Sequence, residues 1–144
     1  MRKVAVVGAG KIGSTVVDLL EGVGDYKVVV IDRSEAALAG LNPHARAERV
    51  ALAIDAPGGL AEALKGCFAV VNCAPYHLTT TVAEAAKTAG AHYLDLTEDV
   101  ASSRVVRELA KDAKTAFIPQ CGLAPGFITI AAWALAKHFD ELHD

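Results

Sequence analysis

Short apolar runs alternate with amphipathic segments from one end of the chain to the other. Runs rich in valine, isoleucine and alanine predict buried strands, and apolar residues at helical spacing predict helices. The expected strands are residues 3–7, 26–31, 49–54, 68–73, 92–96 and 115–118. The expected helices are residues 11–21, 34–41, 78–89, 100–113 and 127–139. The segment Pro57-Gly58-Gly59 is expected to break the chain after the third strand.

Strands that are apolar almost throughout, with helices between them, are typical of a parallel sheet that is covered on both faces. Six such strands make up one doubly wound domain. We therefore predict an α/β fold, a six-stranded Rossmann fold with three layers, α/β/α. A chain of 144 residues has the length of one compact domain, so residues 1–144 are assigned to a single dinucleotide-binding domain.

A glycine-rich turn joins the first expected strand to the first expected helix. Residues 8–13 read GAGKIG, which is the G-x-G-x-x-G spacing of dinucleotide-binding turns. In such a turn Gly8 permits the tight bend, Gly10 lets the backbone approach a pyrophosphate, and Gly13 lets the helix pack closely on the strand. The turn therefore predicts a phosphate-binding loop.

An acidic residue at the end of the second expected strand completes this pattern. Lys11 and Ile12 open the first helix, where free N–H groups and the helix dipole favour an anion. Asp32 lies about 20 residues further on, the spacing of the acid that binds the ribose hydroxyls of NAD. Asp32 repels the 2′-phosphate of NADP, but Arg33 could pair with that phosphate if Asp32 turned away. We predict NAD as the cofactor, with NADP not excluded.

Other candidate binding residues follow the third and fourth expected strands, at the carboxyl edge where open parallel sheets bind ligands. Asp55 and Ala56 follow the third strand and are predicted near the adenine, although a turn role for Asp55 is equally consistent. Cys73, Ala74 and Pro75 follow the fourth strand, along the expected path of the dinucleotide. The sequence therefore predicts that two further loops contact the cofactor.

Three more residues near this edge could serve a substrate. Tyr76 is the candidate catalytic residue because its phenol could reach a substrate, although packing is the more ordinary role of an aromatic side chain on a loop. Asp95 ends the fifth strand, where capping of the next turn is slightly favoured. Cys121 follows the sixth strand, but no activating base lies near it in the sequence, so a nucleophilic role is disfavoured.

Composition excludes several other classes of protein. A net charge of −3 without basic runs argues against nucleic acid as a partner. The first apolar run is too short for a signal peptide or a membrane span. Three cysteines without paired spacing suggest reduced thiols in a cytoplasmic protein. The five histidines have no metal-ligand spacing, so no metal site is predicted.

Four motifs in order resemble one family of enzymes. Residues 4–13 (VAVVGAGKIG), 70–76 (VVNCAPY), 89–95 (AGAHYLD) and 121–126 (CGLAPG) together are similar to the N-terminal NAD(P)-binding domain of saccharopine dehydrogenase-like proteins. The family includes saccharopine reductases and lysine 6-dehydrogenases. The resemblance implies an NAD(P)-dependent oxidoreductase that acts on the C–N bond of a small amino-acid substrate. The nicotinamide would then carry the hydride.

Two departures from the family pattern modify this expectation. Ala124 stands where saccharopine reductases have an acidic residue, which argues against saccharopine itself and favours the lysine-dehydrogenase branch. Family members also continue into a second domain that forms the substrate pocket and a homodimer contact. We therefore expect this chain to be part of a longer enzyme and to turn over little alone.

A second class of function stays open at this point. Stand-alone nucleotide-sensing domains of potassium channels and transporters are similar in length and also combine a G-x-G-x-x-G turn with an acid after the second strand. The GLAPG segment at residues 122–126 favours the enzyme, since a sensor has no evident need for it.

Overall fold

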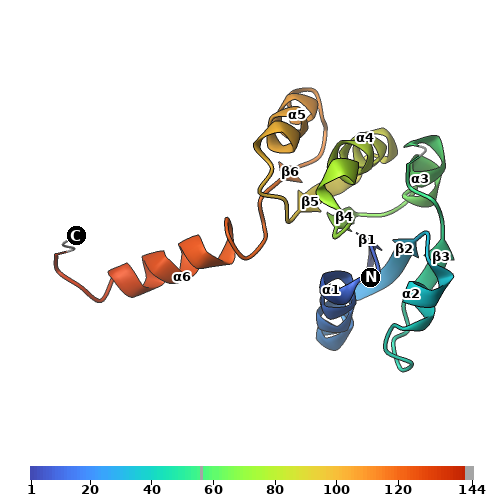
Figure 1. Ribbon diagram of the computed structural model, residues 1–144, viewed down its shortest axis with the longest axis horizontal. Helices are drawn as coiled ribbons and strands as arrows, with labels where there is room; N and C mark the ends of the chain where they lie inside the picture. The colour runs from blue at the N-terminus through green and yellow to red at the C-terminus, as the bar shows by residue number, and fades with distance from the viewer. Residues whose placement is uncertain (56, 142–144) are drawn as a thin grey trace.

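The computed structural model describes residues 1–55 and 57–141, in which strands and helices alternate along most of the chain (Figure 1). The strands are β1 (Arg2–Val7), β2 (Tyr26–Asp32), β3 (Glu48–Ala51), β4 (Ala69–Asn72), β5 (His92–Asp95) and β6 (Phe117–Ile118). The helices are α1 (Lys11–Val23), α2 (Glu35–Ala39), α3 (Pro57–Ala63), the short 3-10 helix η1 (Tyr76–Leu78), α4 (Thr79–Ala89), α5 (Val100–Lys111) and α6 (Phe127–Ala136).

Within the described residues the six strands form one parallel sheet in the order β3-β2-β1-β4-β5-β6. This order confirms the predicted doubly wound sheet. The chain runs outward from β1 to β3 and then returns to β4, so the direction of winding changes between β1 and β4. Val7 of β1 is level with Ile31 of β2 and with Asn72 of β4. The carboxyl ends of these three strands therefore open a crevice at the point where ligands bind in such sheets.

Helices cover both faces of the sheet, as the apolar strands predict. Figure 1 shows α1 and α2 on one face and α3, α4 and α5 on the other. Val6 and Val30 pack in the core with α1 and α2, whereas Val7 and Ile31 pack in the core with α3, α4 and α5. Successive strand residues point to opposite faces, and both faces are buried. Each fully buried valine or isoleucine contributes about 1.5–3 kcal/mol.

The segment after β3 differs from the prediction. Residues 57–59 were expected to break the chain, and this prediction is wrong because Pro57 begins helix α3. Proline is tolerated at the first position of a helix, where its missing N–H has no intrahelical partner to lose. Leu60 and Leu64 are fully buried in the core of that face. This burial offsets the cost of the glycines in the first turn.

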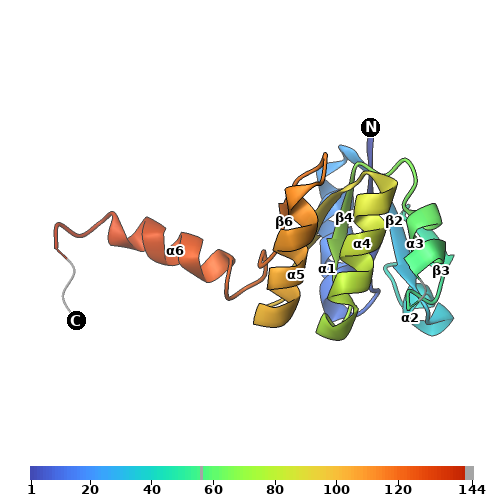
Figure 2. The same ribbon diagram turned by 90° about the horizontal axis from the view of Figure 1, so that it is seen from above.

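Helix α6 lies apart from the sheet, as both views show (Figures 1 and 2). A helix was predicted here, and it ends at Ala136, earlier than expected. Its apolar side chains are exposed, including Phe127 (61%), Trp133 (64%) and Leu135 (63%). The helix therefore contributes nothing to the core that positions the crevice.

Candidate nucleotide and substrate site

The glycine loop lies between the ends of β1, β2 and β4. Gly8 has φ +102°, a left-handed conformation that L side chains rarely adopt, and its N–H donates to the carbonyl of Ile31 at 2.8 Å. A Cβ at Gly8 would lie 2.8 Å from the carbonyl oxygen of Cys73. The loop is therefore pressed against the end of β4, and position 8 requires glycine.

The other two glycines of the motif have different surroundings. A Cβ at Gly13 would collide with the carbonyl of Gly8, so the first turn of α1 can approach the loop only with glycine there. A Cβ at Gly10 would meet no described atom within 4 Å. Gly10 is the N-cap residue of α1, and no side chain of the described residues caps this helix. Its first N–H groups therefore face an open space that suits an anion.

The carboxylate of Asp32 joins the glycine loop to the end of β2. Its Oδ2 accepts a hydrogen bond from the N–H of Ala9, and its Oδ1 accepts one from the N–H of Ser34, both at 2.8 Å. Asp32 is half-buried, whereas the neighbouring Arg33 is exposed. Each carboxylate oxygen keeps a further lone pair for a ligand.

A pocket of about 610 Å³ opens between these elements. Most of the residues predicted to bind the dinucleotide line it: Gly8, Gly10, Asp32, Arg33, Asp55, Cys73, Ala74 and Pro75. Lys11 and Gly13 do not line it, and Ile12 lines a neighbouring pocket instead. Ala56 lies outside the described residues. His77 and Leu78, which sequence reasoning did not select, also line this pocket, which we call the nucleotide cleft.

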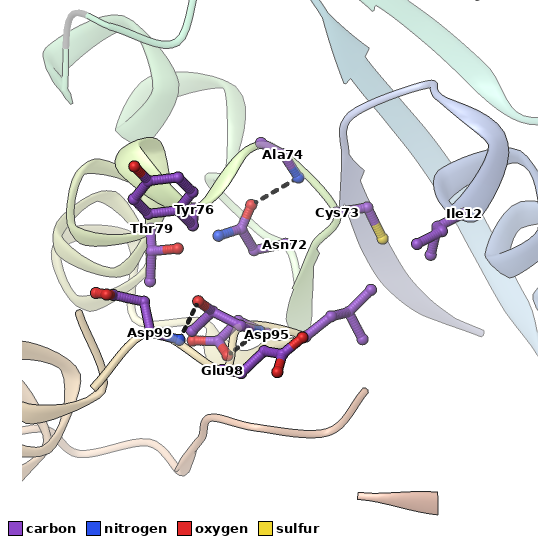
Figure 3. Close-up of a pocket in the computed structure, with 11 residues that line it drawn as sticks. Ile12, Asn72, Cys73, Ala74, Tyr76, Thr79, Asp95, Glu98 and Asp99 are labelled. Carbon is purple, nitrogen blue, oxygen red and sulfur yellow. Dashed lines mark hydrogen bonds between the residues drawn. The ribbon is translucent and has the colours of Figure 1, made fainter. Parts of the chain in front are cut away.

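A second pocket of about 420 Å³ adjoins the nucleotide cleft, because Cys73 and Ala74 line both. Its remaining lining comes from the first turn of α1, the ends of β4 and β5, η1, the start of α4 and the segment before α5: Ile12, Asn72, Tyr76, Thr79, Asp95, Leu96, Thr97, Glu98 and Asp99 (Figure 3). Tyr76, the predicted catalytic residue, lies here with its side chain 64% exposed. Its catalytic role stays a prediction.

A buried polar network supports the wall between the two pockets. The amide Nδ2 of Asn72 donates to the hydroxyl of Tyr93 at 3.2 Å, and that hydroxyl donates to the carbonyl of Thr79 at 3.4 Å. The Oδ1 of Asn72 accepts from the N–H of Ala74 at 3.0 Å. Burial raises the pKa of Tyr93 well above its ordinary range, Asn72 opposes this, and the nearby Asp95 carboxylate adds to it. Tyr93 is therefore a neutral structural residue.

Asp95 holds the ends of β5 and β6 together. Its Oδ1 accepts hydrogen bonds from the N–H of Thr97 at 3.1 Å and of Gln120 at 3.0 Å. The first of these bonds is the turn role that the sequence favoured. The second bond, from Gln120, joins Asp95 to a segment that lies 25 residues further along the chain. Asp95 is only 1% exposed, although it lines the second pocket.

The surroundings of the thiols near the site favour the protonated form. Burial raises the pKa of Cys73 to about 11. The pKa of Cys121 is also raised, first by burial and then by the charge of Asp95. A nucleophilic cysteine needs a lowered pKa. These directions agree with the expectation that Cys121 is not a nucleophile.

Sequence reasoning missed Asn72 and did not separate the two pockets. A polar residue at the end of the apolar strand Ala69–Asn72 is the local signal that could have indicated Asn72. Among the described residues, no group of three or more histidines, cysteines and acidic residues is arranged to hold a metal ion. No helix among them has the length and apolar character needed to span a membrane.

Comparison with known proteins identifies the family of this fold and site. The sequence model described as "Saccharopine dehydrogenase NADP binding domain" matches residues 4–119. The chain belongs to this family. The match spans the strands and loops that line both pockets, and it confirms the resemblance that the sequence motifs indicate.

Individual relatives agree with this membership of the saccharopine dehydrogenase family. The chain is 28% identical to carboxyaminopropylagmatine dehydrogenase of Synechocystis sp. over 159 aligned positions, which cover 99% of this chain and 40% of the relative. Its fold matches saccharopine dehydrogenase (L-Glu forming) of Saccharomyces cerevisiae with a TM-score of 0.83 at 21% identity, over 96% of this chain and 31% of the yeast chain. The chain thus spans less than half the length of these relatives.

A more distant structure shows the same fold with a nicotinamide cofactor bound. The WlbA dehydrogenase of Chromobactrium violaceum, in complex with NADH and UDP-GlcNAcA, matches with a TM-score of 0.68 at 20% identity, over 94% of this chain and 40% of that chain. This likeness shows the fold, and the description of the family supports a nicotinamide dinucleotide as the cofactor class of the domain.

Proposed function

We propose that the chain is the nucleotide-binding part of an NAD(P)-dependent dehydrogenase that acts on a C–N bond of an amino acid or a related amine. The family match and the two relatives support this function, because both relatives are named as dehydrogenases of amino compounds. The same match favours the enzyme over the nucleotide-sensing alternative.

The observation that carries the proposal is the open space at Gly10, beside the uncapped start of α1 and the fixed carboxylate of Asp32. The N–H groups of the first turn would hold the pyrophosphate, and Asp32 would accept the ribose hydroxyls. Asp55, which lines the nucleotide cleft, would then lie on the adenine side, and Cys73 and Ala74, which line both pockets, would lie toward the nicotinamide. When bound, the nicotinamide would exchange a hydride with a substrate carbon.

We further propose that the domain prefers NAD to NADP. Discrimination against NADP fails if Asp32 turns aside and Arg33 pairs with the 2′-phosphate. Both oxygens of Asp32 are tied to backbone N–H groups at 2.8 Å, which opposes that movement. The two hydrogen bonds thus support a role in which the carboxylate of Asp32 repels a phosphate on the ribose.

Tyr76 is proposed to contact the substrate at the mouth of the second pocket. The pocket adjoins the nucleotide cleft, and the exposed ring of Tyr76 lines it, which suits a residue that orients a substrate beside a nicotinamide. The homodimer and the cytoplasmic location that the resemblance and the composition imply stay predictions.

Titration calorimetry tests the cofactor proposal directly. We expect NAD to bind the chain with a Kd on the order of 0.1 mM or tighter, and NADP to bind about 10-fold more weakly. Gly10→Val places a branched side chain in the space for the pyrophosphate and should abolish binding without unfolding the protein, because a Cβ at this position meets no described atom within 4 Å. Undiminished binding by the Gly10→Val variant would overturn the placement of the cofactor.

A further inference from the structure

The second pocket is strongly acidic. Asp95, Glu98 and Asp99 line it, and none of its described lining residues is a lysine, arginine or histidine. Figure 3 shows the three carboxylates along one side of the pocket, with Asn72 and Ala74 on the opposite side. An anionic group that entered this pocket would meet like charge without a compensating cation.

One of these carboxylates has an unused acceptor. The Oδ2 of Asp95 is enclosed and has no hydrogen-bond partner among the described residues, whereas its Oδ1 accepts two backbone N–H groups. A buried carboxylate oxygen without a donor is costly, and such an atom in a native protein calls for an explanation. Since Asp95 lines the pocket, a ligand there is the natural source of the donor.

The protein groups around Asp95 are committed elsewhere. The hydroxyl of Tyr93 lies close enough to Asp95 to interact with it, but its one proton is shared with the carbonyl of Thr79 at 3.4 Å, and Asn72 donates to Tyr93. Asp99 is the N-cap of α5, where its Oδ2 accepts the N–H of Ser102 at 2.7 Å, and Ser102 lowers the pKa of Asp99, first through its side chain and then through this backbone hydrogen bond. The helix therefore compensates part of the charge of Asp99. Glu98 is exposed, and the buried Asp95 keeps one oxygen without a donor, so these two carboxylates carry the uncompensated negative charge of the pocket.

We propose that this pocket binds the alkylammonium group of the substrate, with Asp95 and Glu98 as its anionic partners. The proposal rests on the proposed function and adds which end of the substrate this domain receives. The exposed ring of Tyr76 lies at the same pocket, where an aromatic face also attracts a cation. A carboxylate of the substrate would have to lie outside this pocket.

A divalent metal ion is the other cation that an acidic pocket could bind. The carboxylates of the described residues do not form a group that could hold a metal. An alkylammonium group instead combines N–H donors for Asp95 with a carbon chain that can contact apolar lining residues such as Ile12 and Leu96. The mixed apolar and acidic lining therefore suits an amine better than a bare ion.

NMR titration of the uniformly ¹⁵N-labelled chain tests this proposal at low ionic strength. We expect n-butylammonium chloride to shift the amide signals of residues 95–99 and of Ala74 in a saturable manner, with a Kd on the order of 1 mM. Glutarate should leave these signals unmoved. Saturable shifts with glutarate, or with magnesium chloride but not with the amine, would overturn the proposal.

Charge-neutral variants locate the binding. Asp95→Asn keeps an Oδ1 acceptor for both N–H groups but replaces Oδ2 by a donor, and it should weaken n-butylammonium binding about 10-fold or more. Glu98→Gln changes an exposed side chain that the fold does not need, and it should weaken binding about 2- to 5-fold. Glu108→Gln is the matched control on the exposed surface of α5 and should have no effect. Equal binding by all four proteins would refute the role of the pocket.

Failure of this proposal can be distinguished from failure of the proposed function. NAD titrated into the same labelled protein should shift the signals of residues 8–13. If NAD binds and the amine does not, the domain keeps its nucleotide role and the ammonium site is refuted. If the amine binds and NAD does not, the cofactor placement is refuted instead.

Discussion

The Oδ2 of Asp32 accepts a hydrogen bond from the N–H of Ala9 at 2.8 Å, which ties the end of β2 to the glycine loop. Its Oδ1 accepts the N–H of Ser34 at the start of the next helix. If this carboxylate turned aside, two backbone donors would lose their partner, at a cost of about 1–3 kcal/mol for each one left unsatisfied. The same residue therefore holds the shape of the loop, and in the proposed function it also disfavours NADP.

Replacement of Asp32 by asparagine should reduce both functions of this residue. We expect Asp32→Asn to bind NAD about 10-fold more weakly and to lose most of its preference over NADP, because the negative charge is removed. The free energy of unfolding should fall by about 1–2 kcal/mol, since one of the two N–H groups loses its acceptor. Calorimetry with both cofactors and urea unfolding measure these effects. Asp25→Asn, before the start of β2, is the control. If Asp32→Asn kept the wild-type ratio of the Kd values for NAD and NADP, the prediction would be contradicted.

Two glycines of α1 should respond in opposite ways to the same added methyl group. Gly13→Ala forces a Cβ against the carbonyl of Gly8, so backbone must move, and we expect a loss of about 1–3 kcal/mol in unfolding free energy. Gly22→Ala meets no described atom and should stabilise the helix by up to about 1 kcal/mol. Urea denaturation of the two variants gives the comparison. Equal stabilities would show that the close contact at position 13 relaxes freely.

The layered sheet and the glycine loop could be predicted because their signals are local. Alternation of apolar runs and helical periodicity lies within each segment, and residues 8–13 carry their own spacing. Helix α3 could not be predicted in this way, because proline and glycine are locally unfavourable. Its stability depends on the burial of Leu60 and Leu64 against other elements, which is a tertiary effect.

The candidate site was predictable only in part, for the same reason. Residues at strand ends could be assigned to the cofactor edge, since the carboxyl ends of parallel strands meet. The sequence does not indicate that Asp95 also binds Gln120, because that contact joins segments 25 residues apart. The unpartnered Oδ2 of Asp95 follows from the packing of several elements and has no local signal.

Removal of one hydroxyl should test the polar network between the pockets. In Tyr93→Phe, the Nδ2 of Asn72 loses its buried acceptor, while stacking of ring 93 on Phe117 can persist. We expect the free energy of unfolding to fall by about 1–2 kcal/mol. Tyr26→Phe, at the half-buried start of β2, is the control and should change it little. A Tyr93→Phe variant as stable as the wild type would show that the network contributes no net stability.

The raised pKa of Cys73 predicts a loss of stability at alkaline pH. Below about pH 9 the thiol is protonated in both the folded and the unfolded chain, because its ordinary pKa is 9.0. Between pH 9 and about pH 11 the unfolded chain releases this proton and the folded chain keeps it, so stability falls as the pH rises. The contribution of this group is about 2 kcal/mol.

Urea unfolding of the wild type and of Cys73→Ala at pH 8 and pH 10.5 measures this contribution. The stability difference between the two proteins should shift against the wild type at the higher pH. In parallel, iodoacetamide at pH 8 should label the exposed Cys121 well before Cys73. Fast labelling of Cys73 at pH 8, or a stability difference independent of pH, would mean that this thiol ionises as freely as one in water.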